Sequence, residues 1–138
     1  MILLDTSGML AALDPDQHDH EPAARALAHA EPPLLLSPFV LAELEYLVRR
    51  DSGQHAQLEL LDEVAARVYE LEDFASFDID QARALIVDYS DLRISLADAS
   101  IVVLARRYDA HDVLTLDQRH FRVLPGPSGP FRLLPADA

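Results

Sequence analysis

The 138-residue sequence contains no cysteine and no lysine. Without cysteine it can form no disulfide and use no thiolate chemistry. Without lysine, all eleven basic residues are arginines, whose planar guanidinium groups suit bidentate contact with phosphate. No apolar run approaches the roughly 20 residues that span a bilayer, and the N-terminus lacks the basic, apolar and cleavage regions of an export signal. We therefore expect a cytoplasmic protein with no membrane association.

The formal net charge is −13, which should repel nucleic acid in general. Carboxylates gathered at one site, however, repel one another and attract divalent cations. The acidity therefore argues against a protein that coats nucleic acid, but not against a metal-dependent nuclease. The length and the hydrophobic share of 50% predict a single domain, residues 1–138, with a substantial core.

The N-terminal stretch predicts a short buried strand, Met1–Leu4, that ends in Asp5, Thr6 and Ser7. Its carboxyl end presents an acid and two hydroxyls, and ligands of open α/β sheets bind at that edge. Each of the three residues could instead cap the following helix. Asp5 becomes a site candidate only if other acids converge on it.

Hydrophobic periodicity and turn residues predict the remaining elements. We expect helices at residues 8–13, 22–30, 37–50, 54–69, 78–89 and 95–107. We expect buried strands at residues 34–37, 112–117 and 131–134, and a weak or edge strand within 70–77. Residues 118–121 should break the chain, and the proline-rich segment 125–130 excludes a helix or a central strand. This order predicts an α/β domain, with a central parallel sheet flanked by helices in an α/β/α sandwich.

Glu43 is aligned at helical spacing with Phe39, Val40, Tyr46 and Leu47, so we expect it on the apolar stripe of its helix. An inward carboxylate costs free energy unless it is paired or binds a metal. The alternative is a glutamate at the edge of the stripe that reaches water.

Two more acids occupy comparable positions. Asp98 begins the buried stripe of its helix and also completes a capping box with Ser95, and the two roles are compatible. Asp117 ends the strand at 112–117, as Asp5 ends the first strand. Four acids that converge at one sheet edge would explain all these placements together. His18 and His20 lie in an acidic loop, where we expect solvent exposure rather than metal binding.

The motifs around these acids resemble, in order and spacing, the successive motifs of PIN-domain ribonucleases. They are Ile2–Ser7, Ser37–Glu43, Leu96–Ala99 and Val113–Asp117 followed by Phe121. The resemblance covers nearly the whole chain, and its short single-domain form is similar to VapC-type toxins of type II toxin–antitoxin pairs. It implies one PIN-like domain over residues 1–138, a metal-dependent endoribonuclease that hydrolyses RNA phosphodiester bonds. An antitoxin protein and a second copy of the chain, in a homodimer, are the implied partners.

The resemblance also implies roles for the four acids. Asp5 and Asp98 would bind Mg²⁺ or Mn²⁺ directly or through water, and Glu43 and Asp117 would complete the acidic cage or hold a second ion. Hard oxygen ligands suit Mg²⁺. A bound divalent ion lowers the pKa of water for in-line attack on a backbone phosphate. All four acids are therefore candidate catalytic and metal-binding residues.

Four polar residues have supporting roles in this scheme. Thr6, Ser7 and Thr115 are expected to hydrogen-bond to the metal ligands, and Arg119 is expected to contact a flanking RNA phosphate.

Two other functions remain open from the residues alone. A receiver domain or a haloacid-dehalogenase-like phosphatase also places acids around Mg²⁺ at strand ends, but both use a lysine, and the phosphatase needs an aspartate where Ser7 stands. A PIN-like module could also bind RNA or a partner without cleaving it. Loss of one acid would indicate such a module, and all four are present.

Overall fold

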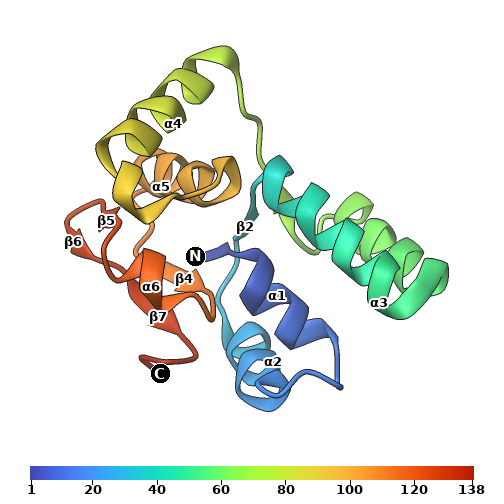
Figure 1. The fold of residues 1–138 in the computed structure, drawn as a ribbon. Coiled ribbons are helices and arrows are strands. Elements are labelled where there is room, and N and C mark those ends of the chain that lie inside the picture. Colours follow the sequence, from blue (N-terminus) through green and yellow to red (C-terminus); the bar gives the residue numbers. More distant parts are fainter.

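The computed structural model describes all 138 residues and is built on a five-stranded parallel sheet in the order β3-β2-β1-β4-β7 (Figure 1). The strands are β1 (Ile2–Leu4), β2 (Leu34–Leu36), β3 (Glu70–Leu71), β4 (Asp112–Leu114) and β7 (Arg132–Leu134). All three residues of the central strand β1 are buried. A parallel sheet covered on both faces demands such unbroken apolar runs instead of alternation. The expected central parallel sheet is confirmed, and β3 is an edge strand as predicted.

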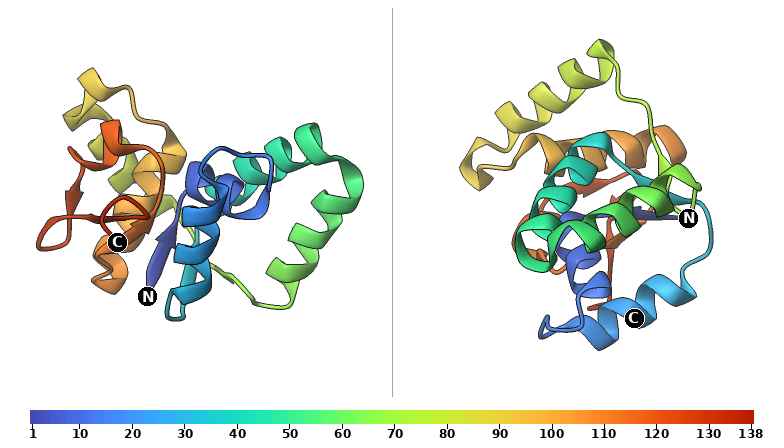
Figure 2. Two further views of the ribbon diagram at one scale, coloured as in Figure 1. Left: turned by 90° about the horizontal axis from the view of Figure 1, so that it is seen from below. Right: turned by 90° about the vertical axis from the view of Figure 1, so that its right-hand side faces the viewer.

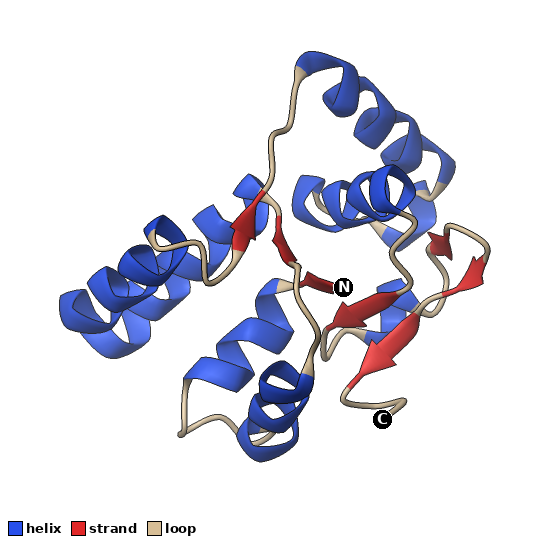
Figure 3. Cartoon of the chain, turned by 180° about the vertical axis from the view of Figure 1, so that it is seen from behind, coloured by secondary structure: helices blue, strands red, loops and turns tan.

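Helices lie on both faces of the sheet (Figure 3). On one face α1 (Thr6–Leu13) packs against α2 (His20–His29), and on the other α4 (Ser76–Asp88) packs against α5 (Leu96–Tyr108). The short 3-10 helix η1 (Ser90–Leu92) leads from α4 to α5. Residues 99–105 of α5 are all buried, so this helix is held firmly against the sheet. No helix combines the length and the apolar character needed to cross a bilayer.

The helix α3 (Pro38–Ala65) contains a bend at Gly53, where φ is 83° and ψ is −177°. Figure 2 shows α3 changing direction partway along its length. A positive φ suits glycine because glycine has no Cβ. The sequence predicted two helices divided near Gly53, and the structure has two helical segments joined by a bend at that residue. The start of α3 is also as expected, since Ser37 Oγ accepts a hydrogen bond from Phe39 N (3.2 Å) and Pro38 occupies the first turn.

The segment after β4 differs from the sequence prediction. Residues 118–121, expected as a break, form the one-turn helix α6 (Gln118–Phe121). The prediction was wrong because Asp117 acts as an N-cap, its Oδ1 accepting a hydrogen bond from His120 N at 3.0 Å. The proline-rich segment that follows forms a small antiparallel hairpin, β5 (Pro125–Gly126) with β6 (Gly129–Pro130), outside the central sheet.

The register of the sheet places the site. Leu4 of β1 pairs with Leu114 of β4, and the strands are parallel. The residues that follow them, Asp5 and Thr115, therefore leave the sheet at the same edge.

Candidate active site

Asp5 lies between β1 and α1 with only 5% of its surface exposed. It occupies the N-cap position of α1, yet its side chain makes no capping hydrogen bond. Instead, Asp5 Oδ2 accepts hydrogen bonds from Thr115 Oγ1 (2.7 Å) and Ser7 Oγ (2.9 Å). Burial raises the pKa of Asp5 from 3.8 to about 6, and the nearby charge of Asp98 adds to the rise, against the opposing effect of the two hydroxyls. The side chain is thus held for a purpose other than helix capping.

The hydroxyls of Ser7 and Thr115 connect Asp5 to the segment after β4. Ser7 Oγ accepts a hydrogen bond from Leu116 N, and Thr115 Oγ1 accepts one from Asp117 N, both at 2.9 Å. The two hydroxyl oxygens lie 3.2 Å apart. Because each hydroxyl contacts both sides, the position of Asp5 and the backbone position of Asp117 are coupled.

Gly8 allows this close approach of α1 to β4. A Cβ atom at Gly8 would overlap the carbonyl group of Leu114 and lie 2.8 Å from Thr115 N. Any larger side chain would force the start of α1, with Ser7, away from Thr115. No local sequence pattern indicates this contact, because it joins segments far apart in the chain.

Glu43 lies on α3 and is exposed to solvent. The expectation that it lies on the apolar stripe was wrong, because the buried stripe runs through Val40, Leu44 and Val48. The side chain at the edge of the stripe still reaches the site, since Glu43 Oε1 accepts a hydrogen bond from Thr6 Oγ1 at 2.7 Å. Thr6 follows Asp5 directly, so this bond ties α3 to the end of β1.

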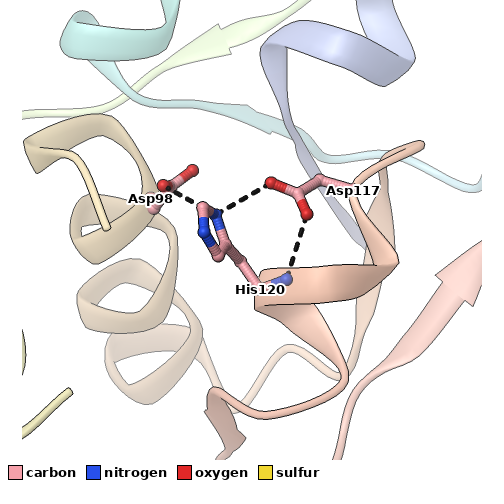
Figure 4. A group of neighbouring side chains, drawn as sticks. All are labelled: Asp98, Asp117 and His120. Carbon is pink, nitrogen blue, oxygen red and sulfur yellow. Dashed lines mark hydrogen bonds and ion pairs between the residues drawn. The ribbon is translucent and has the colours of Figure 1, made fainter. Parts of the chain in front are cut away.

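Asp98 combines the two roles considered for it. It forms a capping box with Ser95, with Ser95 N donating to Asp98 Oδ2 (3.0 Å) and Asp98 N donating to Ser95 Oγ (3.1 Å). Its side chain is 14% exposed and faces Asp117 and His120, as Figure 4 shows. The cap fixes where α5 begins and therefore where this carboxylate points.

His120, a residue that the sequence prediction missed, lies between two of the acids (Figure 4). His120 Nδ1 is 2.9 Å from Asp117 Oδ2 and 3.4 Å from Asp98 Oδ2. One potential ligand atom each from Asp98, Asp117 and His120 lies within 4.8 Å of the others. The available indication in the sequence was the spacing Asp117-x-x-His120, which places both side chains on one turn if a helix starts there.

Asp5 and Glu43 lie outside this tight group of ligand atoms. The hydroxyl of Thr115 links Asp5 to the backbone of Asp117. The charge of Asp98 also raises the pKa of Asp5. The structure therefore brings Asp98 and Asp117 together with His120 and links Asp5 to Asp117 through Thr115. Glu43 contacts Thr6, the residue that follows Asp5.

One arginine and two histidines were the remaining residues considered from the sequence. Arg119 is exposed on α6 and makes no ion pair, so its guanidinium group is available to a ligand. The side chain of His18 is 98% exposed, and His20 Nδ1 lies 2.8 Å from the carbonyl oxygen of Ala11. The predicted solvent exposure is confirmed for His18 and was wrong for His20, which is half-buried at the start of α2.

A cavity of about 640 Å³ lies away from the acids. It lies at the opposite edge of the sheet, against the amino ends of β1, β4 and β7, and its lining includes Arg25, Asp112 and Arg132. Glu43, Asp98 and Asp117 are at least partly exposed, where an extended substrate can reach them, whereas Asp5 is buried behind them.

Comparison with known proteins gives consistent results. The sequence model of the PIN domain matches residues 2–126. The chain is 40% identical over 135 residues to ribonuclease VapC26 of Mycobacterium tuberculosis, an alignment that covers 97% of this chain and 100% of that protein.

Two solved structures are similar in fold. Mycobacterium tuberculosis VapC20, described as a sarcin-ricin loop cleaving toxin, has a TM-score of 0.79 and 24% identity over 85% of this chain and 90% of that one. VapBC2 from Rickettsia felis, bound to a DNA fragment from their promoter, has a TM-score of 0.67 and 22% identity over 96% of this chain and 98% of that one. At these identities the two structures establish the shared fold alone.

Proposed function

The chain belongs to the PIN-domain family, and from this membership we propose that it is the endoribonuclease toxin of a toxin–antitoxin pair, acting through Asp5, Glu43, Asp98 and Asp117. The observation that supports the site assignment is that Asp98 and Asp117 face one group of ligand atoms, that Asp5 is linked to Asp117 through Thr115, and that Glu43 contacts the residue after Asp5. The 40% identity to ribonuclease VapC26 along its full length supports ribonuclease activity. A receiver or phosphatase does not fit the PIN-domain match.

The residues present fit a divalent metal ion. Carboxylate oxygens are suitable ligands for Mg²⁺ and Mn²⁺, and the buried Nδ1 atom of His120 has no hydrogen-bond partner within the chain. When bound, the ion lowers the pKa of water and offsets the charge that develops on the leaving oxygen. Asp98 and Asp117 would hold the ion together with Asp5, and Glu43 would orient bound water or hold a second ion.

The chain's own residues prepare this site. Ser7 and Thr115 hold the Asp5 carboxylate in one orientation, and Thr6 does the same for Glu43. Because these hydroxyls are already in place, little reorganisation is needed when substrate arrives. Arg119, exposed beside Asp117, would bind a flanking phosphate of the RNA.

The partners follow from the same assignment. RNA is the substrate, a cognate antitoxin protein binds the toxin, and the toxin forms a homodimer, all in the cytoplasm where the RNA lies. We also propose that residues 1–138 form one PIN-like domain. Its support is that β7, beyond the matched residues 2–126, pairs with β4 in the same sheet.

Cleavage of total cellular RNA by the purified protein tests the proposal. We expect cleavage with Mg²⁺ or Mn²⁺, none with EDTA, and loss of at least about a hundredfold in Asp98→Ala, because even groups that merely orient a metal ligand contribute 10- to 100-fold. The variant should stay folded, since losing one hydrogen bond costs about 1 kcal/mol.

Asp78→Ala is the matched control. Asp78 Oδ2 accepts a hydrogen bond from Ala75 N (2.8 Å) at the start of α4, as Asp98 does at the start of α5. Asp78 lies outside the acidic site, so the Asp78→Ala variant should cleave RNA as the wild type does. A folded Asp98→Ala protein that cleaves RNA at the wild-type rate would refute the assignment.

A further inference from the structure

His120 is placed by the same short helix that Asp117 begins. Asp117 Oδ1 accepts the backbone hydrogen bond of His120 N at 3.0 Å, which leaves Oδ2 free to face the imidazole. The ring is 18% exposed and its Nδ1 atom is completely buried. The helix cap therefore does more than start α6, because it directs a nitrogen atom at the two carboxylates.

His120 Nδ1 makes ion-pair contacts with both acids but no hydrogen bond. It lies 2.9 Å from Asp117 Oδ2 and 3.4 Å from Asp98 Oδ2, yet no contact has the angles of a hydrogen bond. Buried polar atoms without a hydrogen bond are rare and call for an explanation. A bound ion would replace the two ion-pair contacts of the protonated ring, because an imidazole nitrogen donates a lone pair to a metal at the position from which a proton is absent.

We propose that His120 Nδ1 is a direct ligand of the ion held by Asp98 and Asp117, so that the site prefers a first-row transition ion such as Mn²⁺ to Mg²⁺. This inference rests on the proposed metal-dependent function and adds a nitrogen donor to the four carboxylates. Mg²⁺ takes oxygen ligands almost exclusively, whereas imidazole suits transition ions. The nitrogen donor would therefore make the site bind a transition ion more tightly than Mg²⁺.

The distances fit this arrangement. Two ligand atoms at right angles around an ion, with bonds of about 2.1 Å, lie about 3 Å apart. The separations of His120 Nδ1 from the two carboxylate oxygens, 2.9 and 3.4 Å, are close to that value. Asp98 Oδ2 also accepts the Ser95 N–H, and a carboxylate oxygen has a second lone pair for the ion.

Pulsed electron paramagnetic resonance of the Mn²⁺-loaded protein tests the proposal directly. We expect nitrogen modulation from a coordinated imidazole in the wild type and its loss in both His120→Gln and His120→Ala. The matched control is His111→Gln, because His111 Nε2 also lies beside a carboxylate, 3.2 Å from Asp109 Oδ1, but outside the site. The control should keep the modulation.

Calorimetric titration with Mn²⁺ and with Mg²⁺ gives a second readout that needs no RNA. Loss of the nitrogen donor should weaken Mn²⁺ binding at least about tenfold and Mg²⁺ binding much less, so that the preference for Mn²⁺ shrinks. His120→Gln, which offers an oxygen in place of the nitrogen, should show the smallest preference.

The outcomes separate this inference from the function on which it rests. If the wild type binds Mn²⁺ without nitrogen modulation and Asp98→Ala loses that binding, His120 is not a ligand and the carboxylate site stands. If the His120 variants keep the full preference for Mn²⁺, the inference is likewise overturned. If the wild type binds neither ion, both the inference and the metal-dependent function are wrong.

Discussion

Asp5 is buried and held by two hydroxyls, whereas Asp98 and Asp117 are partly exposed, beside a histidine nitrogen that has no hydrogen-bond partner. The Asp5 side of the site is complete in the protein alone. In the Asp98–Asp117–His120 group, His120 Nδ1 is held by ion-pair contacts alone. The difference teaches that hydroxyls of the protein fix the orientation of Asp5, whereas Asp98 and Asp117 are open to solvent and to a ligand.

The two sides should also differ in how much they destabilise the folded protein when no metal is bound. Burial disfavours the charged form of Asp5 and raises its pKa to about 6. The more exposed carboxylates can be hydrated by water. We therefore expect the main electrostatic cost of the site to lie at Asp5.

The largest expected effect is on the pH dependence of stability. The folded protein holds the Asp5 proton more tightly than the unfolded chain, so metal-free stability should fall as the pH rises from about 4 to about 6 and stay low above that. Asp5→Asn should abolish this fall and raise the free energy of unfolding at high pH by up to roughly 3 kcal/mol, at about 1.4 kcal/mol per pKa unit.

Urea unfolding in EDTA at about pH 5 and about pH 8 measures this effect. Asp16→Asn, at an exposed loop position, is the control and should follow the wild type. Equal pH dependence in wild type and Asp5→Asn would show that Asp5 is not the costly residue.

Metal binding should offset part of this cost. An ion at a hundredfold excess over its dissociation constant stabilises the folded state by about 2.7 kcal/mol, which amounts to several degrees in melting temperature for a domain of this size. Thermal melts in EDTA and in excess Mn²⁺ should show this gain in the wild type. In Asp98→Asn and Asp117→Asn the gain should be much smaller, and an undiminished gain would place the ion elsewhere.

The coupling between the two sides should be visible at Thr115. Thr115→Val removes the hydroxyl that donates to Asp5 and accepts from Asp117 N. We expect RNA cleavage to drop about 10- to 100-fold, the usual effect of losing a group that orients a metal ligand. Thr115→Ser keeps the hydroxyl and should retain most of the activity. Similar rates for the valine and serine variants would deny the hydroxyl this role.

The smallest expected effect is at Arg119. Arg119→Ala should weaken RNA binding and reduce the slope of log affinity against log salt by about 0.7, the value for one phosphate contact on a single strand. Arg106→Ala, an exposed arginine at the far end of α5 without an ion pair, is the control. An unchanged slope in Arg119→Ala would make Arg119 an ordinary surface residue.

Local patterns were enough to predict much of the molecule. Strand β1 and the acid that follows it are visible as an apolar run halted by polar residues, and the capping box of Ser95 and Asp98 depends on four consecutive residues. The parallel sheet follows from the order of strands and helices. These features depend on neighbours in the chain, so periodicity and capping chemistry reveal them.

Contacts between distant segments were beyond such patterns. Glu43 was expected on the apolar stripe, but the neighbouring residue Leu44 is the one buried on α3. Which face of the helix is buried depends on the elements that pack against it. A rotation of one residue on a helix changes the direction of a side chain by about 100°, which is enough to move a carboxylate from the core to the surface.

The sequence by itself determined the apolar strands, the capped helix starts and the acids at their ends, because each depends on residues a few positions apart. Only the tertiary structure decided that Thr115 would bond to Asp5, that Gly8 would let α1 approach β4, and that His120 would face Asp98. In each case two segments meet across the sheet edge, and their relative position is set by packing of the whole core. The local sequence around a side chain therefore does not predict its partner in such a contact.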